Sequence, residues 1–162
     1  MGKRSPAGTP ALVALQRAGI AHTVHTYDHD PSRQDYGIEA AEALSLPPAS
    51  IFKTLLADVD GTAVVAIIPV TSQLNLKALA ASRGSKRARM MEVAAAERLT
   101  GYVAGGISPL GQRKALPTVI DASAGDLPTI YVSGGQRGLD IGIAPQELMQ
   151  LTHATFAPIA AD

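Results

Sequence analysis

Lys53 is a charged residue inside an apolar segment, Ile51–Leu56 (IFKTLL), that has the composition of a buried strand. Lysine is seldom fully buried unless another group pairs with its charge. Strand alternation places Lys53 on the same face as Leu55 and Ala57. We therefore expect its ammonium group to point into a pocket lined by a sheet. The alternative is an edge-strand lysine that lays its stem on apolar surface and keeps its ammonium in water.

Two glycine-rich segments could bring backbone groups close to a ligand, Gly105–Pro109 (GGISP) and Gly134–Gly138 (GGQRG). Adjacent glycines permit positive φ angles and a close approach of the chain. Neither segment continues into the Gly-Lys-Ser/Thr of a phosphate-binding P-loop. The alternative for the first segment is a tight structural turn. The second is most simply a hairpin loop with an exposed arginine.

Other polar side chains give weaker signals. Tyr27 ends a predicted strand just before a polar loop, so its phenol could bind a ligand or simply anchor the loop. His25 and His29 are four residues apart, but the strand and loop between them would not place both on one face, so we expect no metal site. Ser108 lacks the surroundings of a nucleophile elbow. The sequence thus offers no convincing nucleophile and names no reaction by itself.

Composition limits the classes of protein that the chain can belong to. A length of 162 residues fits one domain, which we expect over residues 10–162 after a flexible N-terminal tail over residues 1–9. The absence of cysteine excludes disulfides and thiol nucleophiles and is compatible with a cytoplasmic location. No apolar run approaches the ~20 residues of a membrane helix. Aromatic residues make up only 4%, so base-stacking platforms are not expected.

The formal net charge is zero, which argues against general coating of nucleic acid, DNA included. Residues 77–91 nevertheless contain five basic residues and no acidic one before Glu92. Such a strip could hold a few phosphates, or it could be an ordinary solvated face. Its basic residues are Lys77, Arg83, Lys86, Arg87 and Arg89.

Hydrophobic periodicity and turn signals predict alternating helices and strands without a strict βαβ rhythm. The fold class that fits is α+β, with a mixed, curved, barrel-like sheet surrounded by helices. The segment Thr62–Val70 is apolar on both faces and should be a central strand. Helices are expected over residues 10–18, 37–46, 74–82, 92–99 and 145–151. Strands are expected over residues 22–27, 52–59, 62–70, 86–91, 118–121, 129–133, 139–143 and 154–159. The segment 102–111 should begin as a strand and continue as a glycine-rich loop.

The ordered set of motifs resembles the YbaK-type Cys-tRNA(Pro) deacylases, which are relatives of the editing domain inserted in bacterial prolyl-tRNA synthetases. The resemblance covers residues 10–160, and the combination of Phe-Lys-Thr with Gly-Gly-x-Ser-Pro is specific. Its motifs are HTYDHD at 25–30, FKTLL at 52–56, LNLK at 74–77, TGYV at 100–103, GGISPLGQ at 105–112, IYVSGG at 130–135, RGL at 137–139 and IAPQ at 143–146.

The resemblance implies a cytoplasmic trans-editing enzyme that hydrolyses Cys-tRNA(Pro), with Cys-tRNA(Cys) as a further substrate, and that works beside prolyl-tRNA synthetase without a cofactor. It also implies that the substrate's own thiol attacks its ester, so that the protein contributes position and charge. Lys53, Tyr27 and Gly105 would be catalytic. Substrate binding would involve Thr54, Gly106, Ile107, Ser108 and Pro109, and tRNA binding Lys77, Lys86, Arg87, Arg89 and Arg137.

Two alternatives remain open from the sequence. The same pocket could serve a deacylase for another small amino acid on tRNA(Pro), such as alanine. It could also belong to a non-catalytic module that binds tRNA ends. Pocket volume, which a sequence does not reveal, decides between amino acids of similar size.

Overall fold

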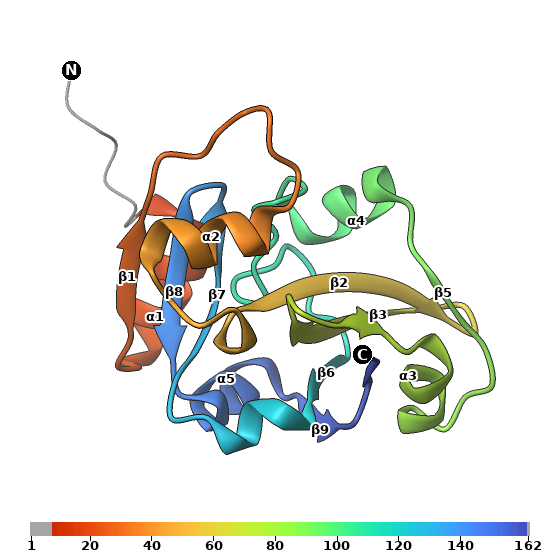
Figure 1. Cartoon of the computed structure of the whole chain (residues 1–162). Helices are drawn as coiled ribbons and strands as arrows, with labels where there is room; N and C mark the ends of the chain where they lie inside the picture. The colour runs from red at the N-terminus through yellow and green to blue at the C-terminus, as the bar shows by residue number, and fades with distance from the viewer. Residues whose placement is uncertain (1–7, 162) are drawn as a thin grey trace.

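The computed structural model describes residues 8–161, so most of the predicted tail over residues 1–9 lies outside the described residues. Its largest sheet has five strands in the order β5-β2-β3-β6-β9 (Figure 1). β3 is antiparallel to β2, whereas β6 is parallel to β3 and β9 is parallel to β6, so the sheet is mixed. Its strands are β2 (Phe52–Val59), β3 (Thr62–Pro69), β5 (Ala88–Met90), β6 (Thr118–Asp121) and β9 (Thr155–Ala157).

A second, antiparallel sheet has three strands in the order β1-β8-β7, and a third has only two, β4 and β10. A single parallel bridge from Ile51 to Tyr131 links the first two sheets just before β2 begins. The strands are β1 (Thr23–Thr26), β4 (Gln73–Leu74), β7 (Ile130–Gln136), β8 (Leu139–Ile143) and β10 (Ala160–Ala161).

Two of the helices begin at residues whose side chains cap them. Thr9 caps the first helix by accepting a hydrogen bond from the Leu12 N–H at 3.2 Å, and Gly19 ends it with a φ of 66°. Asn75 caps the third in the same way, through the Ala78 N–H at 3.0 Å. The helices are α1 (Pro10–Ala18), α2 (Tyr36–Leu44), α3 (Leu76–Ser82), α4 (Val93–Thr100) and α5 (Pro145–Thr152), with short 3₁₀ turns at Pro48–Ser50 and Ala122–Asp126.

The hairpin of β2 and β3 forms the centre of the core. The turn residues Asp60 and Gly61 both have positive φ, 47° and 89°, which is the geometry favoured by tight hairpins. One face of β3 packs in the main cluster, through Val65 and Ile67, with residues of α1, α5 and the second sheet. The other face packs against α3. β3 is therefore buried on both sides, which confirms its prediction as a central strand.

The α+β class of the prediction is confirmed, and three details differ. The described strands fall into three hydrogen-bonded sheets and not into the one mixed sheet that was predicted, while its barrel-like curvature stays a prediction. No strand forms over residues 102–111, where Gly105 and Gly111 have positive φ. The predicted terminal strand over 154–159 is instead the pair β9 and β10, interrupted at Pro158, which has no N–H to donate to a ladder.

Within the described residues, no helix is long and apolar enough to cross a membrane.

Asp121 holds the C-terminal segment to the end of β6. Its buried carboxylate accepts hydrogen bonds from the N–H groups of Ile159 and Ala160, both at 2.9 Å, and from Ser123. Burial alone would raise the pKa of Asp121, but these hydrogen bonds outweigh it and hold the pKa below its ordinary range. The ionised form is thus the one that the fold stabilises.

We predict that Asp121→Ala lowers the free energy of unfolding by about 2 kcal/mol, because buried N–H groups lose a charged acceptor. Since the pKa of Asp121 is lower in the folded than in the unfolded state, its contribution is present above the unfolded pKa and is lost as pH falls through the folded pKa. Urea unfolding of both proteins at pH 7 and in acid measures this. Equal stabilities at pH 7 would contradict the assigned role.

Candidate functional site

A cavity of about 450 Å³ lies along an edge of β2 that is only partly paired. On that edge β5 pairs with Ala57–Val59 alone, and the bridge to Tyr131 lies at Ile51. Among the described residues, no strand pairs with the part of β2 between them. The walls of the cavity come from α2, α4, β2, β5, β7, β8 and the loop that ends at Ile107. The residues that line it include Tyr27, Tyr36, Lys53, Thr54, Met90, Met91, Gly105, Ile107, Ser133 and Asp140.

Thr54 presents unused polar groups to this edge. The Leu56 carbonyl accepts a hydrogen bond from the Met91 N–H at 3.0 Å, so Leu56 points its backbone groups away from β3. Alternate residues of a strand point their backbone groups to the same edge, which places those of Thr54 toward the cavity. The Thr54 hydroxyl is also buried without a hydrogen-bond partner. Because buried polar groups are normally satisfied, Thr54 is suited to bind a polar ligand.

Lys53 is half-buried and lines the cavity. Burial lowers the pKa of its ammonium group. No carboxylate forms an ion pair with Lys53 within the described part of the chain. Its charge is therefore available to a ligand.

Asp140, which the sequence reading missed, is the most deeply buried ionisable group of the cavity at 7% exposure. Burial raises the pKa of Asp140 to about 7. Burial, followed by the nearby charges of Asp140 and Glu39, raises the pKa of Tyr27 to about 12, so Tyr27 is a neutral hydrogen-bond donor at physiological pH. The signal in the sequence was the same as for Lys53: a charged residue in the middle of an apolar strand.

The segment Gly105–Pro109, which we call the Gly-rich loop, is shaped by close contacts. Gly105 has a φ of 83°, and a β-carbon there would lie 2.7 Å from the Tyr36 ring. A β-carbon on Gly106 would lie 2.8 Å from the backbone of Gln136. Of the predicted binding residues in this loop, Ile107 lines the cavity, while Gly106, Ser108 and Pro109 lie behind it.

Ser108 fixes the shape of the loop from inside. It is fully buried, and its hydroxyl accepts a hydrogen bond from the Leu110 N–H at 3.2 Å. Its carbonyl accepts another from the Gln112 side chain at 3.0 Å. Ser108 therefore has no exposed hydroxyl with which to attack a substrate.

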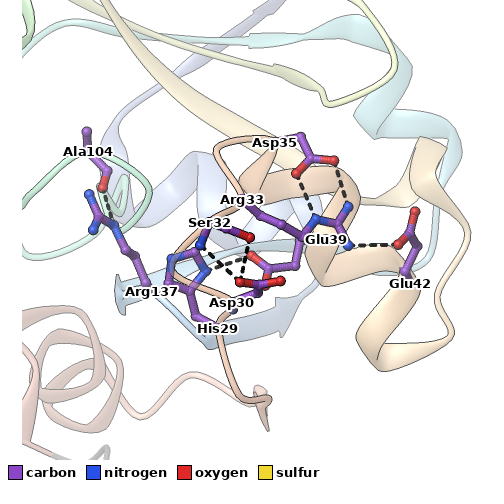
Figure 2. A network of polar contacts seen from close by, with 9 residues as sticks. All are labelled: His29, Asp30, Ser32, Arg33, Asp35, Glu39, Glu42, Ala104 and Arg137. Carbon is purple, nitrogen blue, oxygen red and sulfur yellow. Dashed lines mark hydrogen bonds and ion pairs between the residues drawn. The ribbon is translucent and has the colours of Figure 1, made fainter.

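Arg137 belongs to the rim of this cavity. Its Nε donates a hydrogen bond to the Ala104 carbonyl at 2.8 Å (Figure 2). Its guanidinium group lies 5.1 Å from the centre of the Tyr36 ring, within the range of a cation–π contact. Arg137 thus joins the β7–β8 turn to the Gly-rich loop and to the start of α2. The other four predicted tRNA-binding residues lie together elsewhere, at the far end of β2.

A polar network holds the loop that leads from Tyr27 to α2. Glu39, at 4% exposure, accepts hydrogen bonds from the His29 ring and from the Asp30 N–H, both at 2.7 Å (Figure 2). Arg33 bridges Asp35 and Glu42 on the outside of the same loop. His25 contacts Thr23 instead, so the two histidines do not converge. No group of three potential metal ligands occurs in residues 8–161.

The raised pKa of Asp140 predicts a pH effect on stability. Because the folded state holds the proton more tightly than the unfolded state, the folded protein gains stability as pH falls from about 7 toward the ordinary carboxyl range. We expect Asp140→Asn to remove this gain while leaving the fold intact. Urea unfolding between pH 5 and pH 8 measures both proteins. If the free energy of unfolding depends on pH in the same way in Asp140→Asn as in the wild type, then another group titrates over this range.

Comparison with known proteins identifies the family of the chain. Residues 31–151 match the family described as the aminoacyl-tRNA editing domain. An Enterococcus faecalis protein, EbsC, described as a candidate Cys-tRNA(Pro)/Cys-tRNA(Cys) deacylase, is 41% identical over 120 residues, which cover 74% of this chain and 73% of that protein.

Two solved structures share the fold over nearly the whole of both chains. One is described as a candidate trans-editing enzyme for prolyl-tRNA synthetase (TM-score 0.85, 24% identity, 99% of this chain and 100% of the other). The other is a scaffold used for epitope grafting (TM-score 0.84, 26% identity, 98% and 99%). The family resemblance read from the sequence is confirmed, and the chain belongs to the aminoacyl-tRNA editing domain family.

Proposed function

We propose that this protein is a trans-editing deacylase that hydrolyses the ester between cysteine and tRNA(Pro), and also Cys-tRNA(Cys). The observation that carries the proposal is Lys53, a partly buried cation without an ionic partner among residues 8–161, in a cavity of the aminoacyl-tRNA editing domain. The name of the 41% identical EbsC supports cysteine as the amino acid. We place the enzyme in the cytoplasm, with prolyl-tRNA synthetase as the source of its substrate.

The proposed reaction uses the thiol of the substrate. Among the described residues that line the cavity there is no histidine, so the hydroxyl groups of Thr54 and Ser133 have no imidazole base. The cysteinyl sulfur attacks its own ester carbonyl, a C–S bond forms, and the C–O bond to the ribose breaks. The thiol proton passes to the ribose oxygen, and water then opens the cyclic thioester to give cysteine.

The residues of the cavity would position this reaction. The Lys53 ammonium stabilises the negative charge that develops on the ester oxygen. The neutral Tyr27 phenol and the free polar groups of Thr54 orient the aminoacyl group, and the Gly105 backbone contacts it closely. Ile107 supplies an apolar wall, while Gly106, Ser108 and Pro109 keep the loop in place. Proline lacks a thiol, which makes correctly charged Pro-tRNA(Pro) resistant although the two amino acids are similar in size.

A panel of charged tRNAs tests the proposal. We expect release of amino acid from Cys-tRNA(Pro) and Cys-tRNA(Cys), and stability of Ser-, Ala- and Pro-tRNA(Pro), because only cysteine carries a nucleophilic thiol. Filter assays with radiolabelled amino acids measure this. S-methylation of the cysteinyl group is the control and should stop the reaction. Cys-tRNA(Pro) that survives excess protein would reject the proposal, and hydrolysis of Ala-tRNA(Pro) alone would assign another amino acid.

For Lys53→Ala we expect kcat/KM on Cys-tRNA(Pro) to fall about 100-fold or more, as for removal of one group that stabilises an oxyanion. The melting temperature should change little, since the variant removes a partly desolvated charge that forms no ion pair in the described part of the chain. Lys114→Ala, at an exposed position outside the cavity, is the matched control. Wild-type turnover by well-folded Lys53→Ala would leave Lys53 without a catalytic role.

A further inference from the structure

A second hollow, of about 690 Å³, lies at the other end of β2, around the β2–β3 turn and the segment that leads into β5. We call it the basic groove. Four of its side chains are basic and two are acidic. They are Lys77, Lys86, Arg87, Arg89, Asp58 and Asp60, together with Gly61 and Ala88.

The two carboxylates of the basic groove are already engaged by the protein. Asp60 accepts hydrogen bonds from the backbone N–H groups of Lys86, at 2.9 Å, and Arg87, at 3.5 Å. Asp58 accepts a hydrogen bond from the Gly61 N–H at 2.8 Å and contacts Arg89 at 3.4 Å. The acids therefore hold the loop in shape.

The remaining basic side chains face solvent. Lys77, Lys86 and Arg87 are exposed, and none makes an ion pair within residues 8–161. A groove with an excess of unpaired cations favours a polyanion, and phosphates are the anions that such positions bind in nucleic acids.

Strand β5 connects the basic groove to the cavity. Ala88 and Arg89 line the groove, whereas Met90 lines the cavity. From Lys86 to Met90 the chain advances only about 13 Å if fully extended. Met90 and Val93 also stand unusually exposed for apolar residues, at 46% and 59%, and both belong to the cavity wall. The cavity thus ends in an apolar ledge that leads directly toward the basic groove.

The cavity is larger than a single amino acid would fill. A volume of about 450 Å³ lies within the range of pockets that enclose ligands of drug size, which are much larger than one cysteinyl group. If the aminoacyl ester lies at Lys53 and Gly105, then space remains toward Met90 and Val93. That remaining space is apolar, as the flat face of a nucleobase requires.

We propose, resting on the proposed deacylase function, that β5 guides the single-stranded 3′ end of the tRNA, with the terminal base on the Met90–Val93 ledge and the preceding phosphates in the basic groove. From residue 86 to residue 93 the cations come first, then the apolar ledge, and then the rest of the cavity. This order matches a substrate in which phosphates precede the terminal nucleoside that carries the base and the ester. Phosphate contacts of this kind position a nucleic acid without reading its sequence.

The test compares two substrates, Cys-tRNA(Pro) and 3′-O-cysteinyl-adenosine, which keeps the ester and the base but has no phosphates. For Lys86→Glu/Arg87→Glu we expect kcat/KM on Cys-tRNA(Pro) to fall about tenfold at low salt, with no change on cysteinyl-adenosine. Met90→Asp should instead impair both substrates. The control is Arg17→Glu, an exposed charge reversal on α1 that should affect neither. Unchanged turnover of Cys-tRNA(Pro) by the double variant, or an equal loss on both substrates, would overturn the proposal.

Binding of uncharged tRNA(Pro) separates this proposal from the proposed function, because it does not depend on hydrolysis. The wild-type dissociation constant should rise with salt, and the double variant should lower the slope of log Kd against log salt by about 1.4, for two lost contacts on a single strand. The same affinity and slope in both proteins would reject the groove even if the enzyme edits Cys-tRNA(Pro). A changed slope would support the groove even if the wild-type protein released no cysteine. Loss of binding in Met90→Asp alone would reject the phosphate contacts of the basic groove and leave only the base on the ledge.

Discussion

The incomplete pairing of β2 is the constraint on which the site depends. On one edge β2 pairs with β3 along its whole length, but on the other edge β5 reaches only Ala57–Val59 and the second sheet touches only Ile51. An open strand edge normally invites unwanted pairing, so proteins cover it. Here α2, α4 and the Gly-rich loop enclose the open edge, and the cavity is the space that they leave. The unsatisfied groups of Thr54 are a direct result of this arrangement.

The cavity also contains two ionisable groups that form no ion pair among the described residues, Lys53 and Asp140. Burial shifts the pKa of Lys53 downward and that of Asp140 upward, and neither shift comes from an ionic partner. Desolvated ionisable groups without a partner reduce the stability of a fold, and they are found mainly at functional sites, where a shifted pKa or a free charge serves binding or catalysis. By contrast, Asp121 is buried with four hydrogen bonds and its pKa is lowered, as expected of a structural carboxylate. The opposite pKa shifts of the two buried carboxyl groups therefore indicate a structural role for Asp121 and make Asp140 a candidate functional residue.

Local signals allowed much of this to be predicted from the sequence. The Asp60-Gly61 turn, the Thr9 cap and the doubly apolar β3 each act over a few residues, and all of them are confirmed. The strand predicted from Tyr102 failed because the Tyr102 hydroxyl bonds to the Leu110 carbonyl, a contact within an irregular loop that composition does not reveal. Asp140 was missed because its importance comes from burial beside Tyr27, which is distant in sequence.

Arg137 shows that the charge of a residue does not by itself predict its place in the fold. Sequence reasoning grouped it with the basic strip, but its hydrogen bond to Ala104 and its contact with the Tyr36 ring place it at the rim of the cavity. The Tyr36 ring in turn occupies the space that a side chain at position 105 would need. The separation of the Gly-rich loop from α2 is therefore fixed by Tyr36, Arg137 and the absence of a side chain on Gly105. These contacts at the rim therefore set the width of the cavity beside Gly105.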